Sequence, residues 1–314
     1  MKPLDFLIIG AQKCATTAVF EHLRSHPDIA MPLEKEVPFF TGKNCSQKSW
    51  EAFENEQFGA EQQNKLWAKA SPQYMSDTDV PARIKELMPD VKLVAILRDP
   101  MERTWSHFQM GCRRNTEHRE FAQAIEALLT EEALHTARSL PVPEHTEGYE
   151  SEADFYIAWS EYGRILTEFT ASFDPKQLLV LYTEDLENEP EETLDRLLEF
   201  IGLPPGFRPA TLGDIIHRGG GSSKRIPQSA REWLRNRKML YRLWQRMPAA
   251  RRGRLRFQYE QWNICRNSNS RGNAMLLSEE LQEQLRRHYR KDIDALLSLP
   301  IDPPPWLDRY LVSR

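Results

Sequence analysis

Three short apolar segments constrain the fold of this chain more than any other feature. They span residues 6–9, 91–97 and 177–182, and each is rich in aliphatic side chains. Apolar runs of this length, bounded by turn residues, are typical of buried strands. Segments with a helical spacing of apolar residues separate them. Because buried strands that alternate with helices form parallel sheets, the sequence predicts an α/β fold with a central parallel sheet flanked by helices.

The expected helices have recognisable start and end signals. The first follows residues 6–9 and ends near His26–Pro27. Another begins at Pro100, because Asp99 can cap it and Glu102 stands three residues after the cap, and it extends to about Cys112. Further helices are expected over residues 119–135, 153–172, 190–200 and 278–298.

The composition is that of a globular protein, and it argues against two classes of function. Among the 314 residues, 42 Lys and Arg face 46 Asp and Glu, so the net charge is −4. A chain-wide nucleic-acid binder is usually basic, which disfavours nucleic acid as a partner. No apolar run approaches the roughly 20 residues that cross a bilayer, so no transmembrane segment is expected. We expect one domain over residues 1–314.

The N-terminus and the cysteines bear on the cellular compartment. The first five residues lack the long apolar stretch and cleavage site of a secretory signal. The four cysteines are scattered and form no C-x-x-C pair, which disfavours a disulfide scaffold or a zinc ribbon. These features predict a cytoplasmic protein in a reducing environment. The oligomeric state is left open.

A basic segment at about residues 224–275 stands apart from the rest of the chain. Between Lys224 and Arg256, 12 of 33 residues are basic and Glu232 is the only acidic one. Aromatic residues are interleaved with these charges. We expect a helical segment that could attract an anionic acceptor molecule, and an ordinary solvated surface is the alternative.

The end of the first strand carries the residues of an anion site. Residues 10–17 read Gly-Ala-Gln-Lys-Cys-Ala-Thr-Thr and lead from the strand into a helix. The N–H groups and the dipole of a helix start attract anions, Lys13 adds a full positive charge, and Thr16 and Thr17 can donate hydroxyls. The segment resembles a P-loop but lacks its G-x-x-x-x-G-K-[ST] pattern, since no second glycine precedes Lys13.

A second anion site is expected at the end of the strand over residues 91–97. Arg98 follows this strand directly, at the sheet edge where ligands of α/β proteins bind. Ser106 lies on the next helix, and an arginine fork with a hydroxyl near a helix start suits a phosphate. An arginine at this point holds an anion rather than Mg²⁺. The alternative is a structural pair between Arg98 and a carboxylate.

Two such sites in one chain indicate a ligand with anionic groups at both ends. From the residues alone, three classes stay open. One is a group-transfer enzyme that uses a doubly anionic nucleotide, another is a P-loop-like nucleotide kinase or NTPase, and the last is a binding module without chemistry. The absent P-loop spacing weakens the kinase interpretation.

The motifs resemble those of sulfotransferases that use 3′-phosphoadenosine 5′-phosphosulfate (PAPS), especially the bacterial and heparan sulfate sulfotransferase-like branch. Residues 10–17 are similar to the family's 5′-phosphosulfate loop, and residues 97–106 to its 3′-phosphate motif. Shorter likenesses follow in the same order along most of the chain. They are Ser25–Asp28, Lys35–Phe40, Lys69–Tyr74, Tyr162–Gly163, Leu179–Leu186, Phe200–Leu203 and Tyr289–Trp306.

The resemblance implies the P-loop-NTPase-like sulfotransferase fold, PAPS as donor with 3′,5′-ADP as product, and a set of ligand contacts. The 5′-phosphosulfate would be held by Gln12, Lys13, Cys14, Ala15, Thr16 and Thr17. The 3′-phosphate would be held by Arg98 and Ser106, and a further nucleotide-binding loop would supply Gly221, Ser222, Lys224 and Arg225. Family loops often have glycine where this chain has Ala15, which costs little unless that position needs a positive φ.

The chemistry expected for this resemblance is an in-line transfer of a sulfuryl group to an acceptor hydroxyl, of a carbohydrate or a bacterial small molecule. Lys13 would neutralise the leaving group, and no metal is required if lysine and backbone amides do this. Glu36 is the candidate general base, as in the glycan branch, and Lys69 would orient it or touch the transferred group. Alternatively, Glu36 pairs with Lys35 or Lys69 at the surface, and Lys69 is a solvated loop residue.

Overall fold

The computed structural model describes residues 2–213 and 277–311, except for residues 33–34, 38, 43, 60–61, 115 and 140–151. All of these belong to one compact unit, formed by Met1–Arg218 and Met275–Arg314. A second unit, Gly219–Ala274, lies outside the described residues. The predicted single domain over the whole chain and the basic helical segment therefore stay predictions.

Five parallel strands form the central sheet, in the order β2-β3-β1-β4-β5. Their bounds are β1 Phe6–Gly10, β2 Ile29–Ala30, β3 Leu66–Ala70, β4 Lys92–Leu97 and β5 Leu178–Tyr182. Strand β1 is buried along its whole length, as is β4 apart from its first residue. The predicted parallel sheet is confirmed, and its three predicted strands are β1, β4 and β5. Strands β2 and β3 were not predicted, because neither is a continuous apolar run.

Helices connect the strands and follow them. Their bounds are α1 Thr16–Arg24, α2 Gln47–Gln57, α3 Val80–Leu87, α4 Pro100–Arg114, α5 Phe121–Leu128, α6 Glu131–Ser139, α7 Tyr162–Ser172, α8 Thr183–Asn188, α9 Pro190–Ile201 and α13 Glu279–Leu297. Single 3₁₀ turns are η2 Pro72–Ser76, η3 Glu152–Asp154, η4 Ala158–Ser160, η5 Pro175–Gln177 and η7 Leu307–Arg309. Four predicted helices are confirmed, and most of their ends lie within one or two residues of the predicted positions. They are α1, α4, α9 and α13.

Two predicted helices were too long. The helix expected over residues 119–135 is two helices, because the Thr130 hydroxyl accepts a hydrogen bond from the Ala133 N–H at 3.3 Å and starts α6 anew. The helix expected over residues 153–172 begins only at Tyr162. Before it, Arg119 donates a hydrogen bond to the Ala153 carbonyl at 3.2 Å, and Arg103 donates one to the Tyr156 carbonyl at 3.0 Å. These bonds keep this stretch in short turns.

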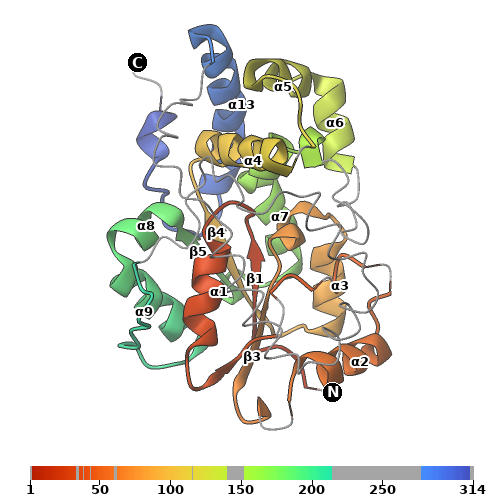
Figure 1. Cartoon of the computed structure of the whole chain (residues 1–314), viewed down its shortest axis with the longest axis vertical. Coiled ribbons are helices and arrows are strands. Elements are labelled where there is room, and N and C mark those ends of the chain that lie inside the picture. The colour runs from red at the N-terminus through yellow and green to blue at the C-terminus, as the bar shows by residue number, and fades with distance from the viewer. Residues whose placement is uncertain are drawn as a thin grey trace, which may run out of the picture. The chain divides into compact units, whose positions relative to one another are not determined.

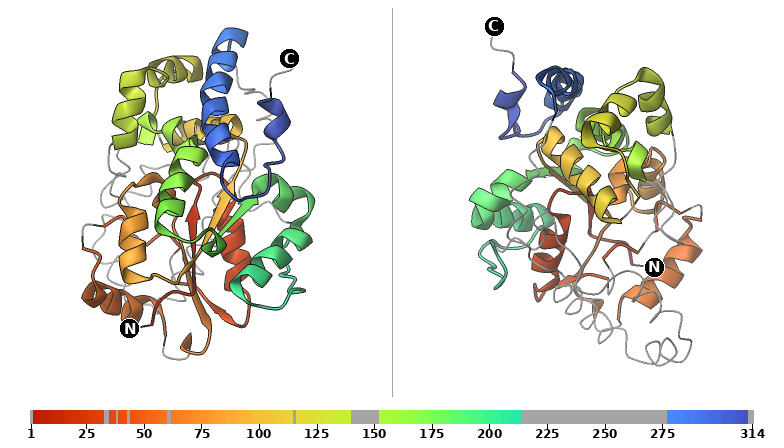
Figure 2. Two further views of the ribbon diagram at one scale, coloured as in Figure 1. Left: turned by 180° about the vertical axis from the view of Figure 1, so that it is seen from behind. Right: turned by 45° about the horizontal axis from the view of Figure 1, so that its top comes forward.

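Helices cover both faces of the sheet (Figures 1 and 2). Helix α1 lies in front of the strands in Figure 1, and α7 lies in front of them when the unit is seen from behind. Beyond the end to which the β1 arrow points, helices α4, α5, α6 and α13 gather. The carboxyl edge of the sheet therefore faces a helical cap, and ligands of α/β proteins bind at this edge.

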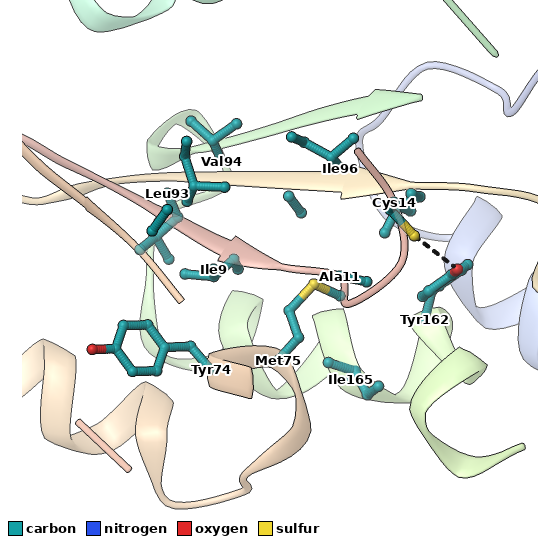
Figure 3. Packing of buried hydrophobic residues seen from close by; sticks show 14 of the residues in the cluster. Ile9, Ala11, Cys14, Tyr74, Met75, Leu93, Val94, Ile96, Tyr162 and Ile165 are labelled. Atoms are coloured by element: carbon teal, nitrogen blue, oxygen red, sulfur yellow. Dashed lines mark hydrogen bonds between the residues drawn. The ribbon is translucent and has the colours of Figure 1, made fainter. Parts of the chain in front are cut away.

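Close packing fixes the end of β1. A Cβ atom at Gly10 would lie 2.6 Å from the Met75 sulfur, so only glycine lets η2 pack against this strand end. Figure 3 shows Met75 next to Ala11.

A Cβ atom at Gly163 would lie 2.0 Å from the Asp292 carbonyl, so the start of α7 can approach α13 only without a side chain. The Asp292 carboxylate caps α7 there, with two 2.8 Å bonds.

None of the helices in the described part of the chain combines the length and the apolar character that crossing a membrane requires.

Candidate functional site

The first and second predicted anion sites lie side by side at the carboxyl edge of the sheet. Strand β1 pairs with β4, with Gly10 opposite Ala95. Just past the strand, the Ala11 N–H donates to the Ile96 carbonyl at 2.8 Å. The loop over residues 11–15 therefore starts beside the last residues of β4, and Arg98 follows within two positions.

The loop between β1 and α1 turns through two left-handed residues. Lys13 has φ 74° and Ala15 has φ 59°. Helix α1 begins directly after Ala15, so its first N–H groups have no partner within the helix and can receive an anion. Ala15 therefore has the positive φ at which alanine is costly. In this conformation a residue with a Cβ destabilises the fold by about 1 kcal/mol relative to glycine.

Lys13 lies in a desolvated and positively charged environment. Burial lowers the pKa of the Lys13 ammonium to about 8, and the neighbouring charges of Arg113, Arg114 and Arg103 lower it further in the same direction. An amine in such surroundings gains strongly from an incoming anion, because the anion restores the balance of charge. This is the electrostatic pattern of an anion site that is not yet neutralised.

The side chains of Cys14 and Gln12 contact buried groups of the protein. The Cys14 sulfur lies 3.6 Å from the Tyr162 hydroxyl on α7 (Figure 3), and burial raises the pKa of this thiol to about 11. The Gln12 amide donates to the Glu152 carboxylate at 3.2 Å. The Cys14 N–H donates to the Ala11 carbonyl at 3.2 Å. The predicted ligand roles of Gln12 and Cys14 stay predictions.

A buried ring of hydrogen bonds holds the loop against α4, and sequence reasoning did not find it. Arg103 donates to the Gln12 carbonyl at 3.0 Å and to His107 Nδ1 at 3.0 Å. His107 Nε2 therefore carries the proton and donates to Glu152 at 3.1 Å. Glu152 accepts from Gln12 and closes the ring. Burial lowers the pKa of His107 to about 3, so this imidazole is neutral and positions the loop.

At the second anion site, the predicted cap is confirmed. The Asp99 carboxylate accepts from the N–H groups of Met101 and Glu102, at 2.9 and 3.2 Å. Arg98 contacts Glu102 one turn further on, with Nη2 and Nε at 2.8 and 3.2 Å from one carboxylate oxygen. Ser106 lies on α4 and is buried. Arg98 thus makes the carboxylate pair that was the alternative to a phosphate contact.

Lys35 connects the candidate base to the loop. Its ammonium lies 3.2 and 2.9 Å from the hydroxyls of Thr16 and Thr17, and 2.8 Å from the Glu36 carboxylate. The Glu36 side chain is 44% exposed, so it is not enclosed in an apolar environment. The pairing of Glu36 with Lys35, which was the alternative interpretation, is present. It also brings the carboxylate to the start of α1.

Lys69 is not the solvated loop residue of the alternative interpretation. It lies on β3, opposite Leu7 in the neighbouring strand, and it is fully buried. Its ammonium has no hydrogen-bond partner among the described residues and lies 5.1 Å from the centre of the Tyr74 ring. Burial lowers the pKa of Lys69 to about 7, with Glu36 acting in the opposite direction. Burial of an ammonium is costly unless the group is paired, so this position favours an anion nearby.

Four predicted contacts, Gly221, Ser222, Lys224 and Arg225, lie outside the described residues. Within the described part of the chain, no cluster of three or more His, Cys, Asp or Glu side chains could hold a metal ion.

With this geometry in place, comparison with known proteins identifies the family. Residues 3–219, more than half of the chain, match the family model of the Sulfotransferase domain. The chain belongs to the sulfotransferase family. The matched range contains both anion sites, together with Lys35, Glu36 and Lys69.

Curated relatives of this sulfotransferase are distant. It is 30% identical over 131 residues to the membrane-associated sulfotransferase kil1 of Dictyostelium discoideum, covering 41% of this chain and 28% of that protein. It is 25% identical over 197 residues to the human heparan sulfate glucosamine 3-O-sulfotransferase 3B1, covering 63% of this chain and 45% of the relative. The chain therefore spans less than half the length of these relatives.

The structural likeness bears out the predicted sulfotransferase fold. The structure of a sulfotransferase from Alicyclobacillus acidocaldarius superimposes with a TM-score of 0.55 at 20% identity, covering 82% of this chain and 97% of that one. At this identity the match speaks for the fold, in which a P-loop-like strand, loop and helix carry the first anion site.

Proposed function

We propose that this sulfotransferase moves a sulfuryl group from PAPS to the hydroxyl of an acceptor. Family membership supports sulfuryl transfer as the class of reaction. The choice of donor rests on two adjacent anion sites, because PAPS carries a phosphosulfate at one end of the nucleotide and a 3′-phosphate at the other. A sugar hydroxyl is the proposed acceptor, since two human relatives are named heparan sulfate glucosamine 3-O-sulfotransferases. Hydroxylated bacterial small molecules are the second acceptor class to test.

The residues around the loop fit such a donor. The charges of Arg103, Arg113 and Arg114 act on Lys13, and the Lys69 ammonium is buried without a hydrogen-bond partner among the described residues. Both features favour a ligand with several negative charges. Thr16, Thr17 and the first N–H groups of α1 would hold the 5′-phosphate, and Arg98 with Ser106 would hold the 3′-phosphate.

The proposed chemistry conserves atoms and charge in one displacement. The acceptor oxygen forms a bond to sulfur while the bond between sulfur and the bridging phosphate oxygen breaks. Lys13 stabilises the negative charge that develops on that bridging oxygen, and 3′,5′-ADP leaves. The Glu36 carboxylate accepts the proton that the acceptor hydroxyl loses. Positioning and electrostatics carry the catalysis, as in phosphoryl transfer.

The contact between Lys35 and both threonines carries this proposal. Glu36 is distant in sequence from the anion loop, yet Lys35 joins its carboxylate to the hydroxyls of Thr16 and Thr17 through bonds of 2.8 to 3.2 Å. A base for the acceptor must lie next to the group being transferred. Of the candidate roles for a glutamate here, general base fits this location best.

The experiment is a mass-spectrometric screen with PAPS as donor, in which a product gains the mass of one SO₃ unit. Oligosaccharides and hydroxylated small molecules are offered in parallel. Glu36→Gln is expected to bind 3′,5′-ADP as the wild type does but to transfer almost no sulfate. The matched control is Glu51→Gln, which changes an exposed carboxylate on α2. Normal transfer by Glu36→Gln would assign the base to another residue.

A thermal-shift comparison separates this proposal from a nucleotide kinase or NTPase. A ligand at 100 times its Kd stabilises the folded state by about 2.7 kcal/mol. We expect 3′,5′-ADP to raise the melting temperature and ATP with Mg²⁺ to leave it nearly unchanged. The opposite ranking would contradict the choice of PAPS as donor.

A further inference from the structure

The C-terminal segment of the described chain, residues 302–311, is docked against the second anion site. Trp306 is buried and packs edge-on against Tyr182, at the end of β5, and against Tyr310. Arg290 on α13 donates to the Tyr310 carbonyl at 2.7 Å. These contacts hold the segment where its polar side chains reach the start of α4.

Arg309 contacts both carboxylates that flank Arg98. Its Nη1 atom lies 2.9 Å from Asp99 and 2.8 Å from Glu102. The Tyr310 hydroxyl donates to the other oxygen of Asp99 at 2.9 Å. Glu102 is thus shared between two arginines, because its second oxygen accepts from Arg98.

This arrangement sets the charge around Arg98. Arg98 and Arg309 pair with Asp99 and Glu102, and a third carboxylate, Glu184, accepts from the Asp99 N–H at 3.2 Å. Removal of Arg309 would leave Arg98 as the one arginine among these three carboxylates, and an incoming phosphate would meet more of their repulsion. Burial raises the pKa of Glu102, but the hydrogen bonds from Arg309 and Arg98 outweigh it, and the pKa lies below its ordinary value.

The geometry also leaves part of Arg98 available. Glu102 accepts from Nε and Nη2 through a single oxygen, and these are the hydrogen bonds of the Arg98 side chain within the described residues. A guanidinium has five N–H donors in a fixed plane, so the remaining donors can bind a phosphate while Glu102 holds the plane in place.

We propose that Arg309 is a positioning residue for the 3′-phosphate of the nucleotide. It pairs with Asp99 and Glu102, which keeps Glu102 fixed against Arg98 and lowers the repulsion that these carboxylates exert on a phosphate at Arg98. This inference rests on the proposed function, because it concerns the 3′-phosphate subsite of the same donor. It assigns the C-terminal segment a part in donor binding.

Calorimetry with 3′,5′-ADP and 5′-AMP tests this role, because only the first ligand has a 3′-phosphate. Arg309→Ala is expected to weaken 3′,5′-ADP binding about fivefold, the size expected for a partly exposed charge, and to leave 5′-AMP binding unchanged. Arg309→Lys retains the positive charge and should bind nearly as the wild type does. Adding Glu102→Gln to Arg309→Ala removes the unbalanced carboxylate and should restore most of the affinity.

The matched control is Arg196→Ala, because Arg196 also pairs with the C-terminal segment, at 2.6 Å from Asp302. It should change neither affinity. Equal weakening of both ligands by Arg309→Ala would mean that the residue only supports the fold, and unchanged binding of both would mean that it has no role; either result overturns the inference. A wild type that does not prefer 3′,5′-ADP over 5′-AMP would instead overturn the proposed function, and the inference with it.

Discussion

The two anion sites lie on neighbouring strands of one sheet, yet they hold their cations in opposite ways. At the end of β1, Lys13 has three arginines around it, and its pKa is lowered to about 8 by burial and by their charges. At the end of β4, Arg98 contacts a carboxylate, and a second arginine from the C-terminal segment contacts the same carboxylate. Arginines surround Lys13 at the first end, where Glu152 pairs with Arg114 at 3.3 Å, whereas carboxylates flank both arginines at the second end.

This difference indicates a division of labour. Excess positive charge in a desolvated place interacts most strongly with charge that develops during a reaction, so the Lys13 end suits chemistry. A guanidinium that a carboxylate holds in a fixed plane recognises a group that does not change during the reaction, so the Arg98 end suits binding. Variants at the two ends should therefore affect different steps.

The largest expected effect is that of Lys13→Ala on turnover. Removing the group that stabilises the leaving oxygen should lower kcat by about 10²–10³-fold, the usual size for one electrostatic donor at a reacting centre. The fold should be retained, which circular dichroism and the melting temperature check. Lys48→Ala, an exposed lysine of α2, is the control. Wild-type turnover in Lys13→Ala would show that the Lys13 end of the site does not take part in the chemical step.

Arg98→Ala should have a smaller effect, and on a different quantity. Loss of a charge-assisted contact to the 3′-phosphate should weaken 3′,5′-ADP binding by about 10–100-fold. Binding of 5′-AMP serves as the internal control and should hardly change. Equal losses for both nucleotides, measured by calorimetry, would show that the two ends of the site are not divided as described.

The last expected effect is on stability rather than on binding or turnover, and it concerns Lys69. Burial lowers the pKa of Lys69 in the folded chain to about 7 from an ordinary value of 10.5. Between these two values the unfolded chain binds more protons, so Lys69 makes stability rise with pH across that window. Lys69→Met should stabilise the protein most below pH 7 and progressively less toward pH 10. Urea unfolding at a series of pH values measures this, and a gain independent of pH would show that Lys69 is not desolvated.

Much of the fold could be predicted from the sequence, because its central strands are continuous apolar runs. Strand β2 has only two residues, and β3 contains Lys69, whose charge breaks the apolar pattern although the side chain is buried. The turns before α7 were predicted as helix because their apolar residues are spaced in a helical way. Two of their carbonyls accept hydrogen bonds from arginines elsewhere in the chain, and no local sequence pattern reveals these bonds.

The candidate site could be predicted where its residues are local to a strand end. Lys13, Thr16 and Arg98 follow directly from the turn after a strand. Glu152 is different, because it reaches His107 and Gln12 across separations of 45 and 140 residues. The spacing of Arg103 and His107 on one face of α4 was the only local signal of that buried ring. Arg309 likewise meets Glu102 only through the docking of the C-terminal segment.

The most direct test of the account is a crystal structure of the protein with 3′,5′-ADP bound. The account predicts one nucleotide along the carboxyl edge of β1 and β4, with its 5′-phosphate on Lys13 and the start of α1, and its 3′-phosphate on Arg98. A nucleotide that contacts only one of these two cations, or binds elsewhere, would contradict it.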